Sequence, residues 1–129
     1  MDKELYQAAL AARKHAYIPY SHFAVGAAVR TAAGKIYTGC NIENASYGLS
    51  MCAERNAIFA AVAQGERQLE ALCVVADTPE PVAPCGACRQ VLAEFKLPHV
   101  YLANCQGKTK EYSWQELLPY DFAAEVLPK

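Results

Sequence analysis

The spacing of apolar and polar residues along the chain predicts an alternation of helices and strands. Residues 2–16 have the period of an amphipathic helix, with Asp2 placed to cap the first turn. Two strand-like runs follow, 23–31 and 35–41, and Gly34 lies between them. We therefore expect a helix followed by a β-hairpin that turns at Gly34.

The second half of the chain predicts two more helices placed between strands. Residues 52–64 form a helix that is apolar on nearly every side, which a one-sided core does not explain. The apolar run 71–76 is typical of a central strand covered on both faces. A helix at 85–95 and a strand at 100–103 would complete a βαβ unit. A weak strand at 108–112 and a short helix capped by Ser113 and ended by Pro119 close the pattern.

Length and charge restrict the class of protein. With 129 residues and 14.1 kDa, we expect residues 1–129 to form one domain. Twelve Lys and Arg against thirteen Asp and Glu, without a basic run, argue against a nucleic-acid partner. No apolar stretch is long enough to span a membrane, and residues 1–4 do not resemble the start of a signal peptide. These features favour a cytoplasmic protein that acts on a small neutral molecule.

Two motifs carry candidate chemistry: Cys-Ala-Glu-Arg at 52–55 and Pro-Cys-Gly-Ala-Cys-Arg-Gln at 84–90. Cys85 and Cys88 would lie on one face of a helix start, and Cys52 would supply a third thiol. Three protein ligands are typical of a catalytic zinc site, which keeps one position open. Glu54 is placed to move the protons of a water at that position. Both cysteine-bearing helices would direct their N-termini at the metal, which favours thiolates.

Other interpretations of the cysteines and histidines stay open at this point. A Cys-x-x-Cys pair alone also suits a redox pair or half of a zinc knuckle, but the second motif at 52–55 disfavours both. Cys40, Cys73 and Cys105 lie in strand-like apolar contexts and are interpreted as small core residues with reduced thiols. None of the three histidines has a metal-ligand spacing.

With these motifs placed, the sequence resembles the short, homotetrameric, zinc-dependent cytidine deaminases over nearly its whole length. Residues 20–28 resemble the family's pyrimidine-pocket segment, and residues 38–47 resemble its nucleoside-binding segment. Leu-Leu-Pro at 117–119, followed by Phe122, resembles the C-terminal signature, although Tyr120 and Asp121 replace the usual small residues. The resemblance implies an α/β fold, a three-layer αβα sandwich with a mixed five-stranded sheet, and one zinc ion per chain.

The resemblance also implies roles for individual residues. Phe23 would stack on the base, and Asn41 and Glu43 would bind the ribose 3′-hydroxyl. The backbone at Ala53 and Pro84 would hold the edge of the base. The other implied roles are pocket closure by Tyr47, compensation of the thiolate charge by Arg55, with Arg89 as a second candidate, and completion of a neighbouring subunit's pocket by Phe122.

The implied activity is hydrolytic deamination of cytidine and 2′-deoxycytidine, a reaction of pyrimidine salvage, with Glu54 as the proton carrier. One rival is a deaminase of a nucleoside antibiotic or of polynucleotide cytosine. The missing basic groove opposes a polynucleotide, and the pair Asn41 and Glu43 favours a free ribose. A second rival is a noncatalytic protein in which zinc only holds the fold. Glu54 opposes it, because a closed structural site has no use for a proton carrier.

Overall fold

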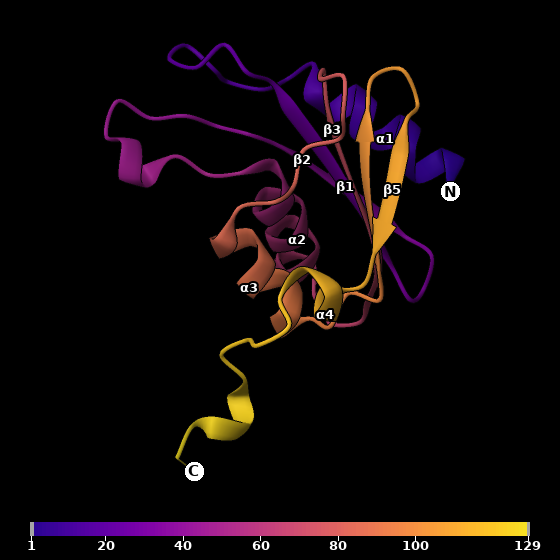
Figure 1. The fold of residues 1–129 in the computed structure, drawn as a ribbon, viewed down its shortest axis with the longest axis vertical. Helices are drawn as coiled ribbons and strands as arrows, with labels where there is room; N and C mark the ends of the chain where they lie inside the picture. Colours follow the sequence, from indigo (N-terminus) through magenta and orange to yellow (C-terminus); the bar gives the residue numbers. More distant parts are fainter. Residues whose placement is uncertain (1, 129) are drawn as a thin grey trace.

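The computed structural model describes residues 2–128 and is built on one five-stranded sheet (Figure 1). The order of the strands across the sheet is β2-β1-β3-β4-β5. β3 and β4 are parallel, whereas the other neighbouring strands are antiparallel, so the sheet is mixed as predicted. The strands are β1 (Val25–Thr31), β2 (Ile36–Cys40), β3 (Leu69–Ala76), β4 (His99–Asn104) and β5 (Thr109–Tyr112).

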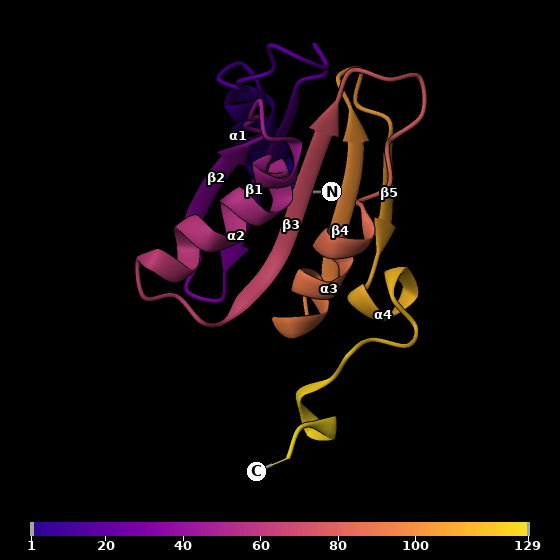
Figure 2. The ribbon, with the colours of Figure 1, turned by 90° about the vertical axis from the view of Figure 1, so that its left-hand side faces the viewer.

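Helices cover both faces of the sheet. Figures 1 and 2 show α1 on one face and both α2 and α3 on the other. Each face has its own cluster of buried apolar side chains, which confirms the three-layer αβα sandwich. Within residues 2–128, no helix is long and apolar enough to cross a membrane. The helices are α1 (Lys3–Arg13), α2 (Ala53–Ala63), α3 (Gly86–Glu94) and α4 (Trp114–Leu117), with two 3-10 turns, η1 (Tyr47–Leu49) and η2 (Ala124–Val126).

Capping and turn residues in the sequence correctly predicted where α1 and α4 begin and where the hairpin turns. Asp2 caps α1 by accepting a hydrogen bond from the Leu5 amide at 3.1 Å. Ser113 and Glu116 form a reciprocal capping box at the start of α4. The hairpin turns at Gly34, whose φ of +93° lies in the region that favours glycine. The first strand begins at residue 25 and not at 23, and the turns η1 and η2 were not predicted.

Strand direction places α2 and α3 beside each other at their N-termini. β2 and β3 are both antiparallel to β1, so they run in the same direction. The segment after β2 leads into α2, and the segment after β3 leads into α3. Both helices therefore begin at the edge of the sheet where the carboxyl ends of β2 and β3 lie, the usual place for a site in an α/β sheet.

The cysteines outside the two motifs have different environments. All are free thiols. Cys73 is completely buried in β3, and this burial raises the pKa of its thiol to about 12. Cys40 is only partly buried at the end of β2. Cys105 follows β4 in a turn, where its partly buried side chain packs against the apolar cluster on the α1 side of the sheet.

Gly39 allows α2 to lie close to the sheet. It pairs with Ala27 in the β1–β2 ladder, beneath the first turns of α2. A Cβ atom at residue 39 would lie 2.4 Å from the Ala57 nitrogen and 2.8 Å from the Ala53 oxygen. Both are backbone atoms, which cannot rotate out of the way as a side chain can. Any side chain at position 39 would therefore displace the helix that carries Glu54.

Gly39→Ala should lower the free energy of unfolding by about 1–3 kcal/mol, the usual cost of overpacking a core. Urea denaturation measures this change. Gly48→Ala is the matched control, because a Cβ there would meet nothing within 4 Å and no positive φ is involved. Equal stability of the two variants would show that α2 adjusts without cost.

Candidate metal centre and substrate cavity

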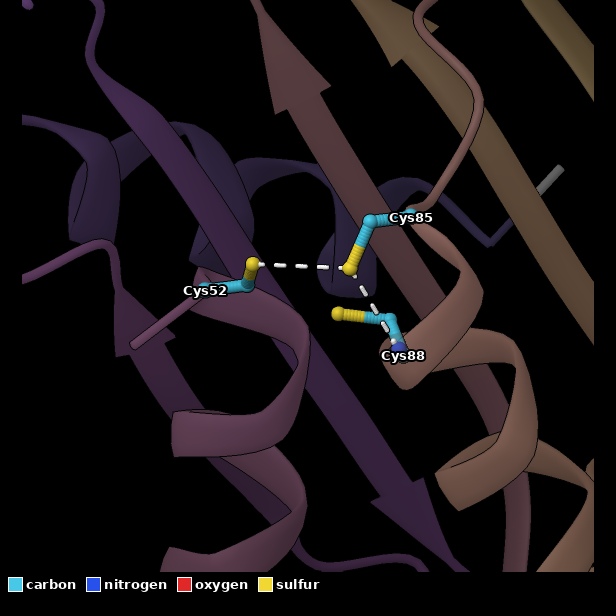
Figure 3. Close-up of side chains that lie close together, drawn as sticks. All are labelled: Cys52, Cys85 and Cys88. Carbon is cyan, nitrogen blue, oxygen red and sulfur yellow. Dashed lines mark hydrogen bonds between the residues drawn. The ribbon is translucent and has the colours of Figure 1, made fainter. Parts of the chain in front are cut away.

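Three thiols meet where α2 and α3 begin. The sulfurs of Cys52, Cys85 and Cys88 all lie within 4.8 Å of one another. Cys52 is the N-cap residue of α2 and Cys85 is that of α3. Figure 3 shows the sulfurs pointing toward one another from these two helix starts. The structure thus brings together all three residues that the motifs predicted as metal ligands.

The geometry of this thiol cluster fits zinc. Two thiolates bound to one tetrahedral zinc at about 2.3 Å lie about 3.8 Å apart. The sulfurs of Cys52 and Cys85 are separated by 3.8 Å. No fourth His, Cys, Asp or Glu of residues 2–128 joins the group. The cluster could therefore hold one zinc ion with three thiolates and leave one position for a ligand that is not a protein group.

The environment of Cys52 favours its thiolate form. The pKa of Cys52 is lowered, because the Cys88 thiol and the Arg55 guanidinium donate hydrogen bonds to its sulfur, and the same pairing raises the pKa of Cys88. The Cys85 sulfur accepts a hydrogen bond from the Cys88 amide at 3.4 Å, in the manner of an N-cap. The positive end of each helix dipole adds to this effect. Thiolates are the form that zinc binds.

Arg55 brings a positive charge to the thiols. Its Nη2 atom lies 3.4 Å from the Cys52 sulfur, and this contact raises the pKa of the guanidinium. Its Nε atom is buried and has no hydrogen-bond partner within residues 2–128. Three thiolates around Zn²⁺ leave a net negative charge, which a cation at this position reduces. The contact agrees with the role expected for Arg55.

Glu54 is a buried carboxyl beside the thiols. The residue is only 6% exposed, and it belongs to the first turn of α2. Burial raises the pKa of its carboxyl to about 7, since the charged form loses its contact with water. Its carboxylate is not part of the metal-binding group. The side chain is thus placed to hold or release a proton next to the cluster.

A cavity of about 250 Å³ opens onto these groups. Phe23 is 41% exposed and forms part of its wall, as expected for an aromatic ring that would stack on a base. Val74, Val82 and Ala83, which the sequence analysis did not single out, add apolar surface. The cavity walls also include Asn41, Cys52, Ala53, Glu54 and Cys85.

Asn41 holds the segment that carries Phe23. Its Oδ1 atom accepts a hydrogen bond from the Val25 amide at 2.9 Å, and its Nδ2 atom donates to the Phe23 carbonyl at 2.7 Å. Each end of an amide side chain can form two hydrogen bonds, so one donor and one acceptor site stay free. Asn41 can therefore order this segment and still bind a sugar hydroxyl.

Glu43 fastens the neighbouring part of the same segment. Its carboxylate accepts hydrogen bonds from the Tyr20 and Ser21 amides at 3.1 Å each and from the Ser21 hydroxyl. The Ser21 hydroxyl is the main cause of the lowered pKa of Glu43. A carboxylate has about four acceptor sites, so little capacity is left for a sugar. Ser21 gave no signal in the sequence beyond its place between motif residues.

The remaining predicted residues lie outside the cavity. Tyr47 and Glu43 border a separate hollow of about 350 Å³. There the ring centroids of Tyr47 and Tyr20 are 5.9 Å apart. The Pro84 carbonyl accepts a hydrogen bond from Arg89 at 2.9 Å. Arg89 thus contacts backbone oxygens and not the thiols. Phe122 lies in the C-terminal segment and lines none of the cavity.

Comparison with known protein families agrees with a zinc site at the thiol cluster. Residues 1–104 match the family described as "Cytidine and deoxycytidylate deaminase zinc-binding region". This chain belongs to the cytidine and deoxycytidylate deaminase family. A family of zinc-binding proteins explains why three thiols converge here, and zinc is the ion that the cluster fits.

Relatives in the deaminase family match nearly the whole chain. The cytidine deaminase of Halalkalibacterium halodurans is 53% identical over 128 residues, which are 97% of each chain. The crystal structure of the cytidine deaminase of Burkholderia pseudomallei has a TM-score of 0.91 at 52% identity, and the match covers 95% of this chain and 99% of that one. The blasticidin-S deaminase of Bacillus cereus is more distant, with 29% identity over 76% of each chain.

Replacing Cys52, Cys85 or Cys88 by Ala should abolish zinc binding, since each change removes one of only three protein ligands. Atomic absorption of the purified variants gives the zinc content per chain. Cys73→Ala is the control, because its thiol lies on the α1 side of the sheet and should leave the zinc in place. Full zinc content in all three variants would place the metal elsewhere.

Proposed function

We propose that this chain catalyses the hydrolytic deamination of cytidine and 2′-deoxycytidine, which consumes water and yields uridine or 2′-deoxyuridine and ammonia. One observation carries the proposal: the buried carboxyl of Glu54 lines the same cavity as Cys52 and Cys85, two of the three clustered thiols. A cavity that opens onto a cluster of metal-binding thiols and a proton carrier suits addition of water to a base.

The residues around the thiol cluster have separate roles in the proposed reaction. Cys52, Cys85 and Cys88 hold zinc, which when bound makes water reactive near neutral pH. Glu54 accepts one proton from the water that adds to C4 of the base and delivers it to N3. It then accepts the second proton of the same oxygen and delivers it to the departing amine, which leaves as ammonia. Its burial keeps this carboxyl away from bulk water. Arg55 reduces the negative charge of the thiolates and so preserves the effect of the metal.

The substrate would be held at both its base and its sugar. Phe23 offers a partly exposed aromatic face in the wall of the cavity, and Ala53 offers the free backbone N–H of a helix start. Asn41 would bind the sugar with the donor and acceptor sites that the segment 20–25 leaves free, and Glu43 would add only the little acceptor capacity that it has left. Tyr47 belongs to the adjacent hollow, where it would border the open side of the pocket.

Substrate class distinguishes this proposal from its rivals. The proposal treats residues 1–129 as one catalytic domain that acts in pyrimidine salvage in the cytoplasm. Ultraviolet absorbance of the protein mixed with cytidine, deoxycytidine, cytosine, CMP, blasticidin S or single-stranded DNA measures deamination of each. Turnover of the two nucleosides should far exceed that of the others. Turnover of none of them, with zinc bound, would favour the structural zinc protein.

Glu54→Gln should slow cytidine deamination by at least ~10²-fold while zinc stays bound, because the amide keeps the shape of the side chain but cannot transfer protons. Steady-state rates and zinc content are measured on the same sample. Near-normal turnover would remove Glu54 from the mechanism. Loss of zinc would instead make Glu54 a structural residue.

Assembly into a homotetramer with sites near the subunit interfaces is the second part of the proposal. It is supported by apolar side chains that a lone chain leaves exposed, such as Phe59 of α2 at 44% and Leu49 of η1 at 68%. Phe122 is 62% exposed and would complete the pocket of a neighbouring subunit. Burial of these side chains between subunits would also explain the apolar character of α2.

Mixed oligomers of Glu54→Gln and Phe122→Ala chains should be more active per site than either parent variant. Some sites would then combine an intact Glu54 from one chain with an intact Phe122 from its neighbour. Co-expression with two different affinity tags isolates these oligomers, and cytidine turnover is compared per zinc. No gain on mixing, or a monomer in sedimentation, would show that Phe122 does not act across an interface.

A further inference from the structure

The C-terminal segment is held to α3 by one side chain. Residues 119–128 extend past α4, away from the sheet (Figures 1 and 2), and η2 has no buried residue. Within this segment, the Phe122 amide donates a hydrogen bond to Oε1 of Gln90 at 3.1 Å. Nε2 of the same Gln90 donates to the Phe122 carbonyl at 2.9 Å. Gln90 thus satisfies both backbone polar groups of Phe122.

This pairing reproduces the bonding of a β-strand neighbour. In an antiparallel ladder, two opposed residues exchange one N–H donor and one carbonyl acceptor in each direction. The carboxamide of glutamine carries the same two groups, so Gln90 acts as a one-residue strand partner. Such a paired contact fixes the orientation of the backbone as well as its position. The direction of the Phe122 side chain is then determined.

A second contact from the same part of α3 supports the first. Arg89 donates from Nη1 to the Leu117 carbonyl at 2.8 Å and from Nε to the Pro84 carbonyl at 2.9 Å. Arg89 and Gln90 directly follow Cys88, which belongs to the thiol cluster. The helix that begins at the metal centre therefore holds α4 at Leu117 and the C-terminal segment at Phe122.

The clamped residue, Phe122, remains largely exposed. Phe122 is 62% exposed although both of its backbone groups are bonded. If the segment were held only to cover α3, the ring would be the group to bury, since it carries most of the apolar surface. A fixed backbone with an exposed ring is suited to contact with another copy of this chain.

We infer that Gln90 is a positioning residue, which fixes the backbone of Phe122 so that its ring enters the substrate pocket of a neighbouring subunit. The inference rests on the proposed function and assembly. It adds a route by which the metal-binding helix of one subunit sets the shape of the pocket in the next.

Hydrogen exchange measured by mass spectrometry on overlapping peptides of residues 117–128 tests the contact itself, in the zinc-loaded oligomer. Gln90→Met keeps the length of the side chain but removes both hydrogen bonds, so exchange of the Phe122 amide should become about tenfold faster. Gln90→Glu still accepts from this amide but cannot donate to the carbonyl at neutral pH, and should give an intermediate rate. Gln115→Met, at an exposed position of α4, should exchange like the parent.

Steady-state kinetics on cytidine tests the positioning role. Gln90→Met should lower kcat/KM with zinc content unchanged. In a chain that already carries Phe122→Ala, the same change should have no further effect, because Gln90 acts only through Phe122. A further loss in the double variant, or unchanged exchange at Phe122 in Gln90→Met, would overturn the inference. A parent that deaminates no nucleoside would overturn the proposed function, whereas the exchange rates still decide whether Gln90 holds Phe122.

Discussion

Two helix N-termini meet at one edge of the sheet, and the rest of the molecule depends on this contact. α2 and α3 both direct unpaired backbone N–H groups and the positive ends of their dipoles at the same small volume. Two such ends repel each other unless negative charge lies between them. As thiolate ligands of a zinc ion, the N-cap residues Cys52 and Cys85 would supply that charge. The chemistry of the site and the packing of the two helices thus have the same origin.

The sheet fixes the distance at which these helix ends meet. β1 lies between β2 and β3 and is antiparallel to both, so the two connections emerge on the same side of the molecule. Gly39 then lets α2 approach the sheet until backbone nearly touches backbone. In this arrangement Glu54 lies buried in the first turn of α2, two residues after Cys52. A small change in the distance between α2 and the sheet would move the Glu54 carboxyl away from the cavity.

The sequence predicted the elements and the thiol cluster because those signals are local. Cys85 and Cys88 are neighbours on one helix, and Ser113 and Glu116 bond within one turn. The arrangement of Asn41, Glu43 and Tyr47 was harder to foresee, since their partners lie about twenty residues earlier in the segment 20–25 and no periodicity reports such contacts. Arg89 beside Cys88 was considered for charge compensation, yet its guanidinium reaches the carbonyls of Pro84 and Leu117.

Asn41 shows how this fold lowers the entropy that binding must overcome. By bonding to the Phe23 carbonyl and the Val25 amide, its side chain extends the ladder beyond the last backbone pair of β1. Glu43 holds the other end of the segment by accepting hydrogen bonds from the amides of Tyr20 and Ser21. A loop that is ordered before a ligand arrives has little conformational freedom left to lose. The aromatic wall of the cavity is therefore preorganised, and less of the free energy of contacts made to it is lost in ordering the loop.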